Sequence, residues 1–161
     1  MKRILIPVAG LLMLVVTACN NTDKKKSEVA NDDNAGKTAT SADSLYKDVI
    51  KGHDEAMRGW MHLEGKKKEI NQLLDSIAKL PAKAKSTAEQ LRIKLTETNT
   101  ELQSAYDEMD KWMNEINLDS AKDNLEQRIK YFTEEKLKVS KVKEAINNSL
   151  QKADSLLKAR L

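Results

Sequence analysis

Residues 88–116, AEQLRIKLTETNTELQSAYDEMDKWMNEI, decide the fold of this chain of 161 residues. Within this stretch one series recurs every seven residues, at Ala88, Leu95, Leu102, Met109 and Ile116. A companion series follows at Leu91, Thr98, Ala105 and Trp112. Because seven residues make almost two helical turns, both series lie on one face, as in coiled coils. The spacing predicts a helix over 86–116 that packs against other helices.

The segments on either side carry related patterns. After the break at Asn117 to Ser120, apolar residues again recur every seven positions, at Leu125, Phe132, Val139, Ile146 and Ala153. Before Pro81, a stripe recurs at three and four residues, at Tyr46, Val49, Ile50, His53, Met57, Trp60, Met61, Ile70, Leu74 and Ile77. Between Met61 and Ile70, Glu64 and Lys67 interrupt this stripe, so we expect this section either to lie edge-on to the core or to pack loosely. The patterns predict an all-α fold, an elongated antiparallel three-helix bundle with coiled-coil-type packing over 43–161.

Turn and capping residues set the expected helix bounds. Asp43 or Ser44 is expected to cap a helix over 44–80, and Pro81 to end it. Ser86 has capping-box spacing to Glu89, and Asp119 or Ser120 with Asp123 is expected to start a helix over 120–159. Gly52 and Gly59 share one face of the first helix and would allow another helix to approach closely.

The N-terminal residues MKRILIPVAGLLMLVVTAC have the features of a secretory signal. Lys2 and Arg3 form a charged region, and 4–16 form an apolar region too short to span a bilayer. The stretch Val16-Thr17-Ala18-Cys19 resembles the lipobox of bacterial lipoproteins. The resemblance implies that residues 1–18 are removed and that Cys19 carries diacylglycerol and an N-acyl chain. Residues 19–42, rich in Asn, Asp, Lys, Ser and Thr, are then expected to form a disordered tether.

Composition narrows the function classes. Without its leader the chain keeps 26 of its 28 basic residues against 25 acidic ones, because Lys2 and Arg3 leave with the leader. This balance gives no basis for nucleic-acid binding. The chain contains neither a G-x-S-x-G motif, nor a Gly-rich phosphate loop, nor H-E-x-x-H. We therefore expect a non-enzymatic protein with no cofactor apart from the lipid on Cys19.

A short repeat is the most unusual feature of the predicted bundle. Residues 57–61 and 109–113 both read M-x-x-W-M, and folding back at Pro81 would bring them level. His53 lies one turn before the first repeat. Thioether and imidazole groups suit a soft metal such as Cu(I), which makes His53, Met57, Met61, Met109 and Met113 candidate ligands. We favour the alternative that these residues, with Trp60 and Trp112, fill the core or contact a partner.

His53-Asp54-Glu55-Ala56-Met57 and Met109-x-x-Trp112-Met113 resemble motifs of small helical lipoproteins of Bacteroidota, some of them labelled "viral A-type inclusion protein". The likeness covers residues 43–158. In that group the first motif more often continues P-x-M, whereas this chain has Arg58-Gly59-Trp60-Met61. The resemblance implies a helical fold and an envelope location, and it implies no chemistry.

Together these observations predict a lipid-anchored envelope protein with a structural or protein-interaction role. An unidentified envelope protein is its expected partner. No acidic run follows Cys19 and no Asp stands next to it, so we expect the periplasmic side of the outer membrane. The alternative is a periplasmic copper-binding protein that uses the Met and His cluster.

Overall fold

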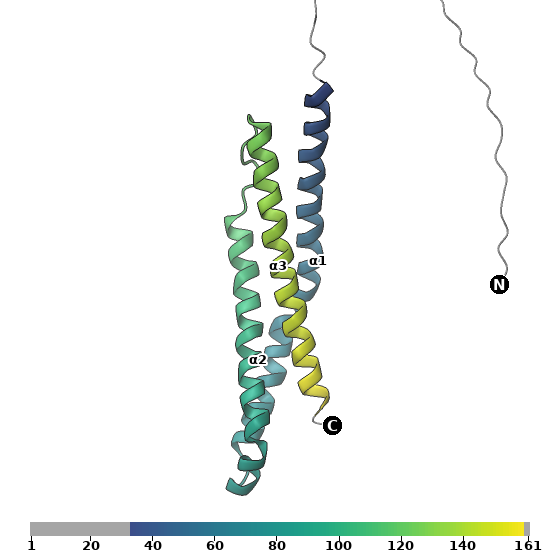
Figure 1. Ribbon diagram of the computed structural model, residues 1–161. Coiled ribbons are helices and arrows are strands. Elements are labelled where there is room, and N and C mark those ends of the chain that lie inside the picture. Colours follow the sequence, from purple (N-terminus) through teal and green to yellow (C-terminus); the bar gives the residue numbers. More distant parts are fainter. Residues whose placement is uncertain (1–32, 160–161) are drawn as a thin grey trace, which may run out of the picture. The chain divides into compact units, whose positions relative to one another are not determined.

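The structure, a computed structural model, describes residues 33–159. This part of the chain forms three helices and no strand: α1 (Asp33–Ala78), α2 (Ala82–Glu115) and α3 (Leu125–Lys158). Each helix packs against both of the others (Figure 1). The prediction of an all-helical fold with three mutually packed helices is confirmed.

The first helix begins earlier than the sequence indicated. We expected the tether to reach residue 42, but α1 already starts at Asp33, so this prediction is wrong for residues 33–42. Ala42 is only 2 % exposed, which shows that the packed face of α1 extends back before Asp43. The leader 1–18, Cys19 and the tether 19–32 lie outside the described residues.

The start of α2 also differs from the expected cap. Pro81 immediately precedes the helix, and its carbonyl oxygen accepts a hydrogen bond from the Lys85 N–H at 2.9 Å. Proline suits a helix start because it has no N–H to leave unpaired and its φ is already helical. Ser86 therefore lies inside α2, and Glu89 pairs with Arg92 at 2.7 Å instead of completing a capping box.

The start of α3 is set by Asn124. Its side-chain oxygen accepts from the Gln127 N–H at 3.0 Å, so the expected caps at Asp119 or Ser120 are wrong. The physical reason lies in the turn, because Ala121 has a φ of 54°. A left-handed residue at this position cannot belong to a right-handed helix that begins at Ser120.

The buried face of α1 follows a stricter repeat than expected. Ala56 is 1 % exposed and Leu63 is fully buried, so the stripe has no loose section between Met61 and Ile70. The predicted interruption is wrong because the expected stripe follows residues next to the buried ones on the helix surface. The buried face itself runs through Ala56 and Leu63 without a break. The buried series recurs every seven residues, at Ala42, Val49, Ala56, Leu63, Ile70 and Ile77.

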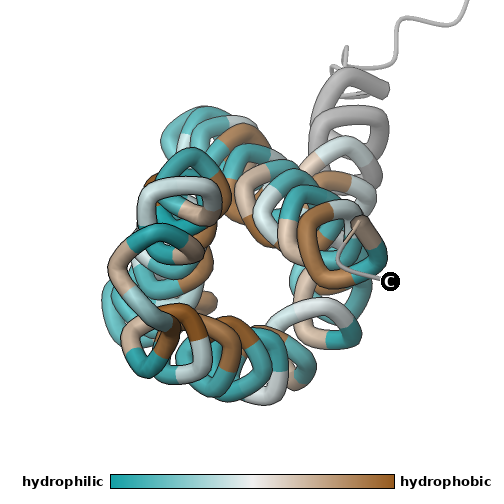
Figure 2. The backbone as a smooth tube through the Cα atoms, turned by 90° about the horizontal axis from the view of Figure 1, so that it is seen from below, coloured by the Kyte–Doolittle hydropathy of each residue, from teal (hydrophilic) through white to brown (hydrophobic). Residues whose placement is uncertain are grey.

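The predicted positions of the other two helices do form the core. In α2 the buried side chains are Leu95, Thr98, Leu102, Ala105, Met109 and Trp112. In α3 they include Phe132, Val139, Ile146 and Ala153. Figure 2 shows hydrophobic residues recurring along the inner side of the three helices. Most of the heptad positions read from the sequence are thus buried, whereas Ala88, Leu91, Ile116 and Leu125, near the helix ends, are only partly buried.

Glycine brings α1 close to α3, as expected. A Cβ atom added to Gly52 would lie 2.8 Å from Val139 Cγ1, and one added to Gly59 would lie 2.6 Å from Ile146 Cγ2. Both distances are shorter than real Cβ contacts, so a larger residue would push the helices apart. Gly65 is different, because its added Cβ would meet nothing within 4 Å.

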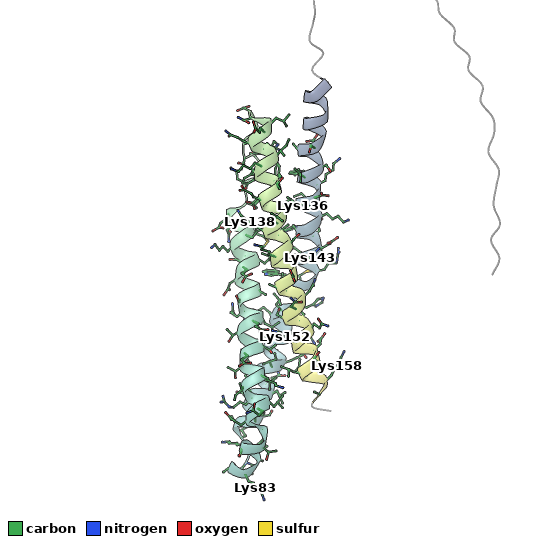
Figure 3. The ribbon with its side chains drawn as sticks, in the orientation of Figure 1. Lys83, Lys136, Lys138, Lys143, Lys152 and Lys158 are labelled. Carbon is green, nitrogen blue, oxygen red and sulfur yellow. The ribbon has the colours of Figure 1, made fainter. Side chains whose placement is uncertain are left out.

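Ion pairs join α1 and α3 at a constant interval. Asp48 pairs with Lys136 at 2.7 Å, and Glu55 pairs with Lys143 at 2.9 Å. In both pairs the two residues are 88 positions apart in the sequence. Figure 3 shows Lys136 and Lys143 along α3. The Lys66–Asp154 pair, at 3.0 Å, keeps the same interval.

Candidate functional site

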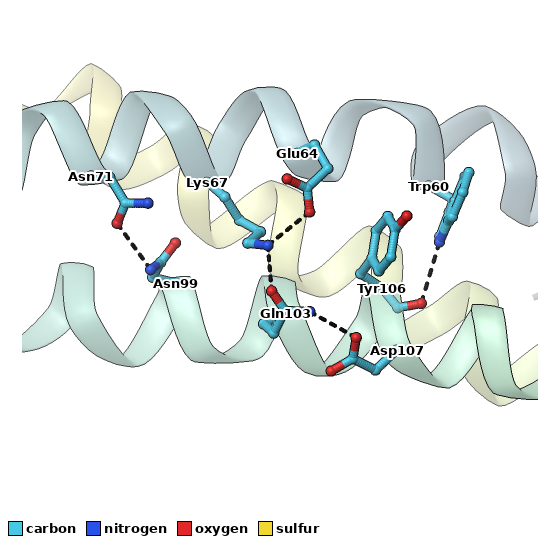
Figure 4. Close-up of polar contacts among 8 residues, drawn as sticks. All are labelled: Trp60, Glu64, Lys67, Asn71, Asn99, Gln103, Tyr106 and Asp107. Carbon is cyan, nitrogen blue, oxygen red and sulfur yellow. Dashed lines mark hydrogen bonds and ion pairs between the residues drawn. The ribbon is translucent and has the colours of Figure 1, made fainter.

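The two M-x-x-W-M segments lie at the same level of the bundle. The Trp60 ring stacks on the Tyr106 ring with centroids 4.7 Å apart, and Trp60 Nε1 donates to the Tyr106 carbonyl oxygen at 3.3 Å (Figure 4). The His53 ring lies 5.9 Å from the Trp112 ring. These contacts join the 53–60 part of α1 to the 106–112 part of α2, and they define the candidate site.

At its inner side the site contains a buried carboxylate. Trp112 is 5 % exposed, and its Nε1 donates to Glu135 Oε2 at 2.9 Å. Glu135 is itself only 3 % exposed, and its other oxygen accepts from Lys138 Nζ at 2.7 Å. The carboxylate therefore has a charged donor and an indole donor, which compensate for its loss of water.

Lys138 connects this buried carboxylate to the surface. Its side chain is largely exposed, while the Glu135 side chain beneath it is almost fully covered. The hydrogen bond that Lys138 donates to the Glu135 carboxylate raises the pKa of Lys138 above its ordinary value. The arrangement holds α2 and α3 together through a directional contact that apolar packing cannot supply.

Sequence reasoning missed Glu135. The residue stands three positions after Phe132 and seven before the buried Val142, at a heptad position where an apolar residue is the rule. A charged residue at such a position was the available signal, since it needs a polar partner on a facing helix. The indole N–H of Trp112 is that partner.

The candidate sulfur ligands lie in different surroundings. Met109 is fully buried, whereas Met61 is 64 % exposed. Met61 lies two residues before buried Leu63 and therefore points about 200° away from it around α1. Met57 and Met113 are partly buried and pack against the core. Met61 thus does not share a site with Met109, and the five proposed ligands do not form one set.

His53 already uses one ring nitrogen. Its Nδ1 lies 2.9 Å from Asp54 Oδ1, and its side chain is 30 % exposed. Only Nε2 is then free to bind a metal. In the part of the chain that the structure describes, no group of three or more His, Cys, Asp and Glu side chains is placed to hold a metal ion. His53, Met57, Met109 and Met113 remain as the candidate soft donors, and of these the His53 ring lies 5.9 Å from the Trp112 ring.

The lysine run 66–68 is used within the bundle. Lys66 contacts Glu69 at 3.3 Å and Asp154 at 3.0 Å, and both contacts raise its pKa although burial opposes them. Lys67 Nζ contacts Glu64 at 2.7 Å and donates to Gln103 across the helix pair (Figure 4). Two of the three lysines thus serve contacts inside the fold.

None of the described helices has a segment that is both long and apolar enough to cross a bilayer. No protein-family model, curated protein or solved structure matches this chain.

Proposed function

We propose that this chain is a lipid-anchored envelope protein with a structural or protein-interaction role and no enzymatic one. One observation carries the proposal: the inward side chains of all three helices recur every seven residues and are used in packing. The outward positions are mostly charged, and several of them pair between helices. A bundle of this kind is a rigid support for an outer surface that another protein can contact.

The proposal also includes the relative directions of the three helices, which we infer from the residues that contact each other. A constant interval of 88 between paired residues requires α1 and α3 to run the same way. Contacts of α1 with α2 pair Trp60 with Tyr106 and Asn71 with Asn99, so numbers fall along α2 as they rise along α1. We infer an antiparallel up-down-up bundle with coiled-coil-type packing. At 46 residues, α1 alone would span about 69 Å.

The anchor is proposed from the lipobox-like sequence at Cys19 and the apolar leader before it. We place the protein on the periplasmic side of the outer membrane, because no acidic run follows Cys19 and no Asp stands next to it. Replacement of Cys19 by Ala should abolish labelling with a palmitate analogue and leave the leader attached. A variant that is still labelled would refute the anchor and would leave the bundle's role open.

The interaction role has its own test. A photo-crosslinking residue would replace Met61, Lys111 or Leu137, which are exposed positions on α1, α2 and α3. In intact cells we expect one discrete adduct, formed from one face of the bundle and lost when Cys19 is replaced by Ala. Equal, diffuse labelling from all three positions would contradict a specific partner.

Titration with Cu(I) under a competing chelator tests the rival metal-binding function. On our proposal Met109→Leu has no effect on copper binding, because this buried methionine fills the core. One tightly bound equivalent that is lost in Met109→Leu and in His53→Ala would replace our proposal with a soft-metal function. Met61→Leu is the matched control, since Met61 lies outside the donor set.

A further inference from the structure

The hairpin end, residues 71–93, consists of the last turns of α1, the turn at Pro81 and the first turns of α2. It extends beyond the end of α3 (Figure 1). The Lys66–Asp154 pair sets the level of the two helices, and α3 ends at Lys158, level with about residue 70 of α1. The hairpin end therefore has two helices where the middle of the bundle has three.

Its apolar side chains are less covered than those of the bundle. Leu63 and Ile70 of α1 are fully buried, whereas Leu73, Leu74 and Leu91 are only partly buried. Leu80, directly before the turn, is 37 % exposed. The apex of the hairpin end thus presents an apolar side chain to its surroundings.

The lysines of the hairpin end have no ion-pair partner in the described part of the bundle. Lys79, Lys83 and Lys85 are exposed, and within the described residues none has a carboxylate at ion-pair distance. No acidic residue occurs between Asp75 and Glu89, and Glu89 is engaged by Arg92. Figure 3 shows Lys83 at this end. Elsewhere Lys66, Lys136, Lys143 and Lys152 all pair across helices.

The segment that joins α2 to α3 has the opposite charge. Residues 116–124 carry Asp119 and Asp123 against one lysine, Lys122, and Glu115 of α2 and Glu126 of α3 flank them. An anionic surface would repel this segment and attract the hairpin end. The bundle would therefore meet such a surface in a single orientation.

We propose that the hairpin end docks on an anionic bilayer surface, with the three lysines at lipid phosphates and Leu80 in the interfacial layer. A tight turn between two helices is convex, which suits a planar surface, whereas an acidic peptide would need a groove between the lysines. Basic residues around an exposed leucine are the combination that interfacial binding uses. This inference goes beyond the proposed function. Because α1 spans about 69 Å and the 14 residues from Cys19 to Asp33 reach at most about 50 Å, the docked bilayer would be one that faces the membrane holding Cys19.

The test measures co-sedimentation of the full-length chain with phosphatidylcholine vesicles that contain or lack phosphatidylglycerol. A basic residue near an anionic surface contributes about fivefold in affinity, so Lys79→Gln/Lys83→Gln/Lys85→Gln should lower the phosphatidylglycerol-dependent binding about a hundredfold. The control Lys68→Gln/Lys130→Gln/Lys141→Gln removes the same charge from exposed positions outside the hairpin end and should keep that binding. The N-terminal sequence is identical in both variants and cannot produce the difference.

Leu80→Ser tests the apolar part of the contact. Loss of a leucine from the interface should weaken binding to these vesicles about tenfold, and circular dichroism checks that the variant stays helical. The proposal fails if the hairpin-end triple variant keeps its phosphatidylglycerol-dependent binding or if the control loses as much. Binding to polyglutamate without binding to the vesicles would also overturn it, because the partner would then be an acidic protein.

Discussion

The middle of the bundle and the hairpin end are built from similar sequence but have different surroundings. In the middle, Leu63 and Ile70 are fully buried and Gly59 lies against Ile146 of α3. At the hairpin end the same series ends at Ile77, which is 5 % exposed, and the neighbouring Leu73 and Leu74 are only partly buried. The difference is the third helix, which is present in one region and absent from the other.

The third helix also decides what the lysines do. Lys66 of α1 contacts Asp154 of α3, while Lys79, beyond the end of α3, has no such partner among the described residues. Both lysines lie on α1 or directly after it and look alike in the sequence. The ion pair of Lys66 thus depends on α3, and the position of Lys79 beyond the end of α3 leaves it without that partner.

Core truncation should give the largest contrast between the two regions. Phe132 is fully buried and meets the Tyr46 and Tyr131 rings with centroids 5.5 and 5.4 Å away. Phe132→Ala should lower the free energy of unfolding by about 3–5 kcal/mol, because it removes apolar contacts and leaves a cavity. Urea unfolding followed by circular dichroism measures this change.

Leu80→Ala is the matched truncation at the hairpin end, where the side chain is 37 % exposed. It should cost less than about 1 kcal/mol, since water can fill the space. Equal costs for the two variants would mean that the hairpin end is packed as tightly as the middle.

The buried polar contact gives a second, smaller contrast. Trp112→Phe keeps an aromatic ring in the core but removes the donor to Glu135, a bond of 2.9 Å. It should cost about 1–3 kcal/mol, because a buried carboxylate loses a partner. Trp60→Phe removes a longer bond of 3.3 Å at a partly buried position and should cost about 1 kcal/mol or less. A larger loss of unfolding free energy in Trp60→Phe than in Trp112→Phe would contradict a stabilising role of the Trp112 indole at the Glu135 carboxylate.

Much of the core could be predicted from the sequence. The seven-residue series of α2 identified Leu95, Leu102 and Met109, and all three are fully buried. The repeat works because burial along a helix depends mostly on which side a residue faces. The helix starts could not be predicted in this way, because Ser86 and Asn124 both offer a side-chain cap and only the course of the chain decides which is used.

The candidate site was predictable in its position and not in its chemistry. The repeated Met and Trp residues do lie at one level, as the turn at Pro81 required. Met61 is exposed because the buried face of α1 is the one that contains Leu63, and Met61 lies outside that face. Glu135 was missed because its burial depends on Trp112, which is distant in sequence and meets it only across the α2–α3 interface.

Glycine variants sharpen the comparison within a single helix. Gly59→Ala would place a Cβ 2.6 Å from Ile146 Cγ2, whereas Gly65→Ala meets nothing within 4 Å. Alanine is favoured over glycine in a helix by about 1 kcal/mol, so Gly65→Ala should stabilise by about that amount. In Gly59→Ala, overpacking of about 1–3 kcal/mol should cancel or outweigh the same gain.

Thermal unfolding of both glycine variants measures the difference. We expect a higher midpoint for Gly65→Ala and an unchanged or lower one for Gly59→Ala. Stabilisation of both by the same amount would show that α1 can move away from α3 at no cost.

The smallest expected effect is the pH dependence of the α1–α3 ion pairs. The hydrogen bond and charge of Lys136 hold the pKa of Asp48 below its ordinary value of 3.8, and Lys143 holds that of Glu55 below 4.5. A carboxylate with a lowered pKa in the folded state contributes stability above its unfolded pKa and loses it as pH falls through the folded pKa. The unfolding midpoint should therefore fall as pH drops below 4.5 and continue to fall below 3.8. Both pairs are partly exposed, so the change should be modest and weaker in high salt.

Asp48→Asn/Glu55→Gln should flatten this decline, because the paired carboxylates that bind protons on acidification are gone. Glu97→Gln/Glu144→Gln is the control, since it removes two exposed carboxylates that have no ion pair within the described residues. It should leave the pH profile of the unfolding midpoint as it was. If both double variants flattened the profile equally, the acid sensitivity would come from the total charge of the bundle and not from the contacts that α3 makes with α1.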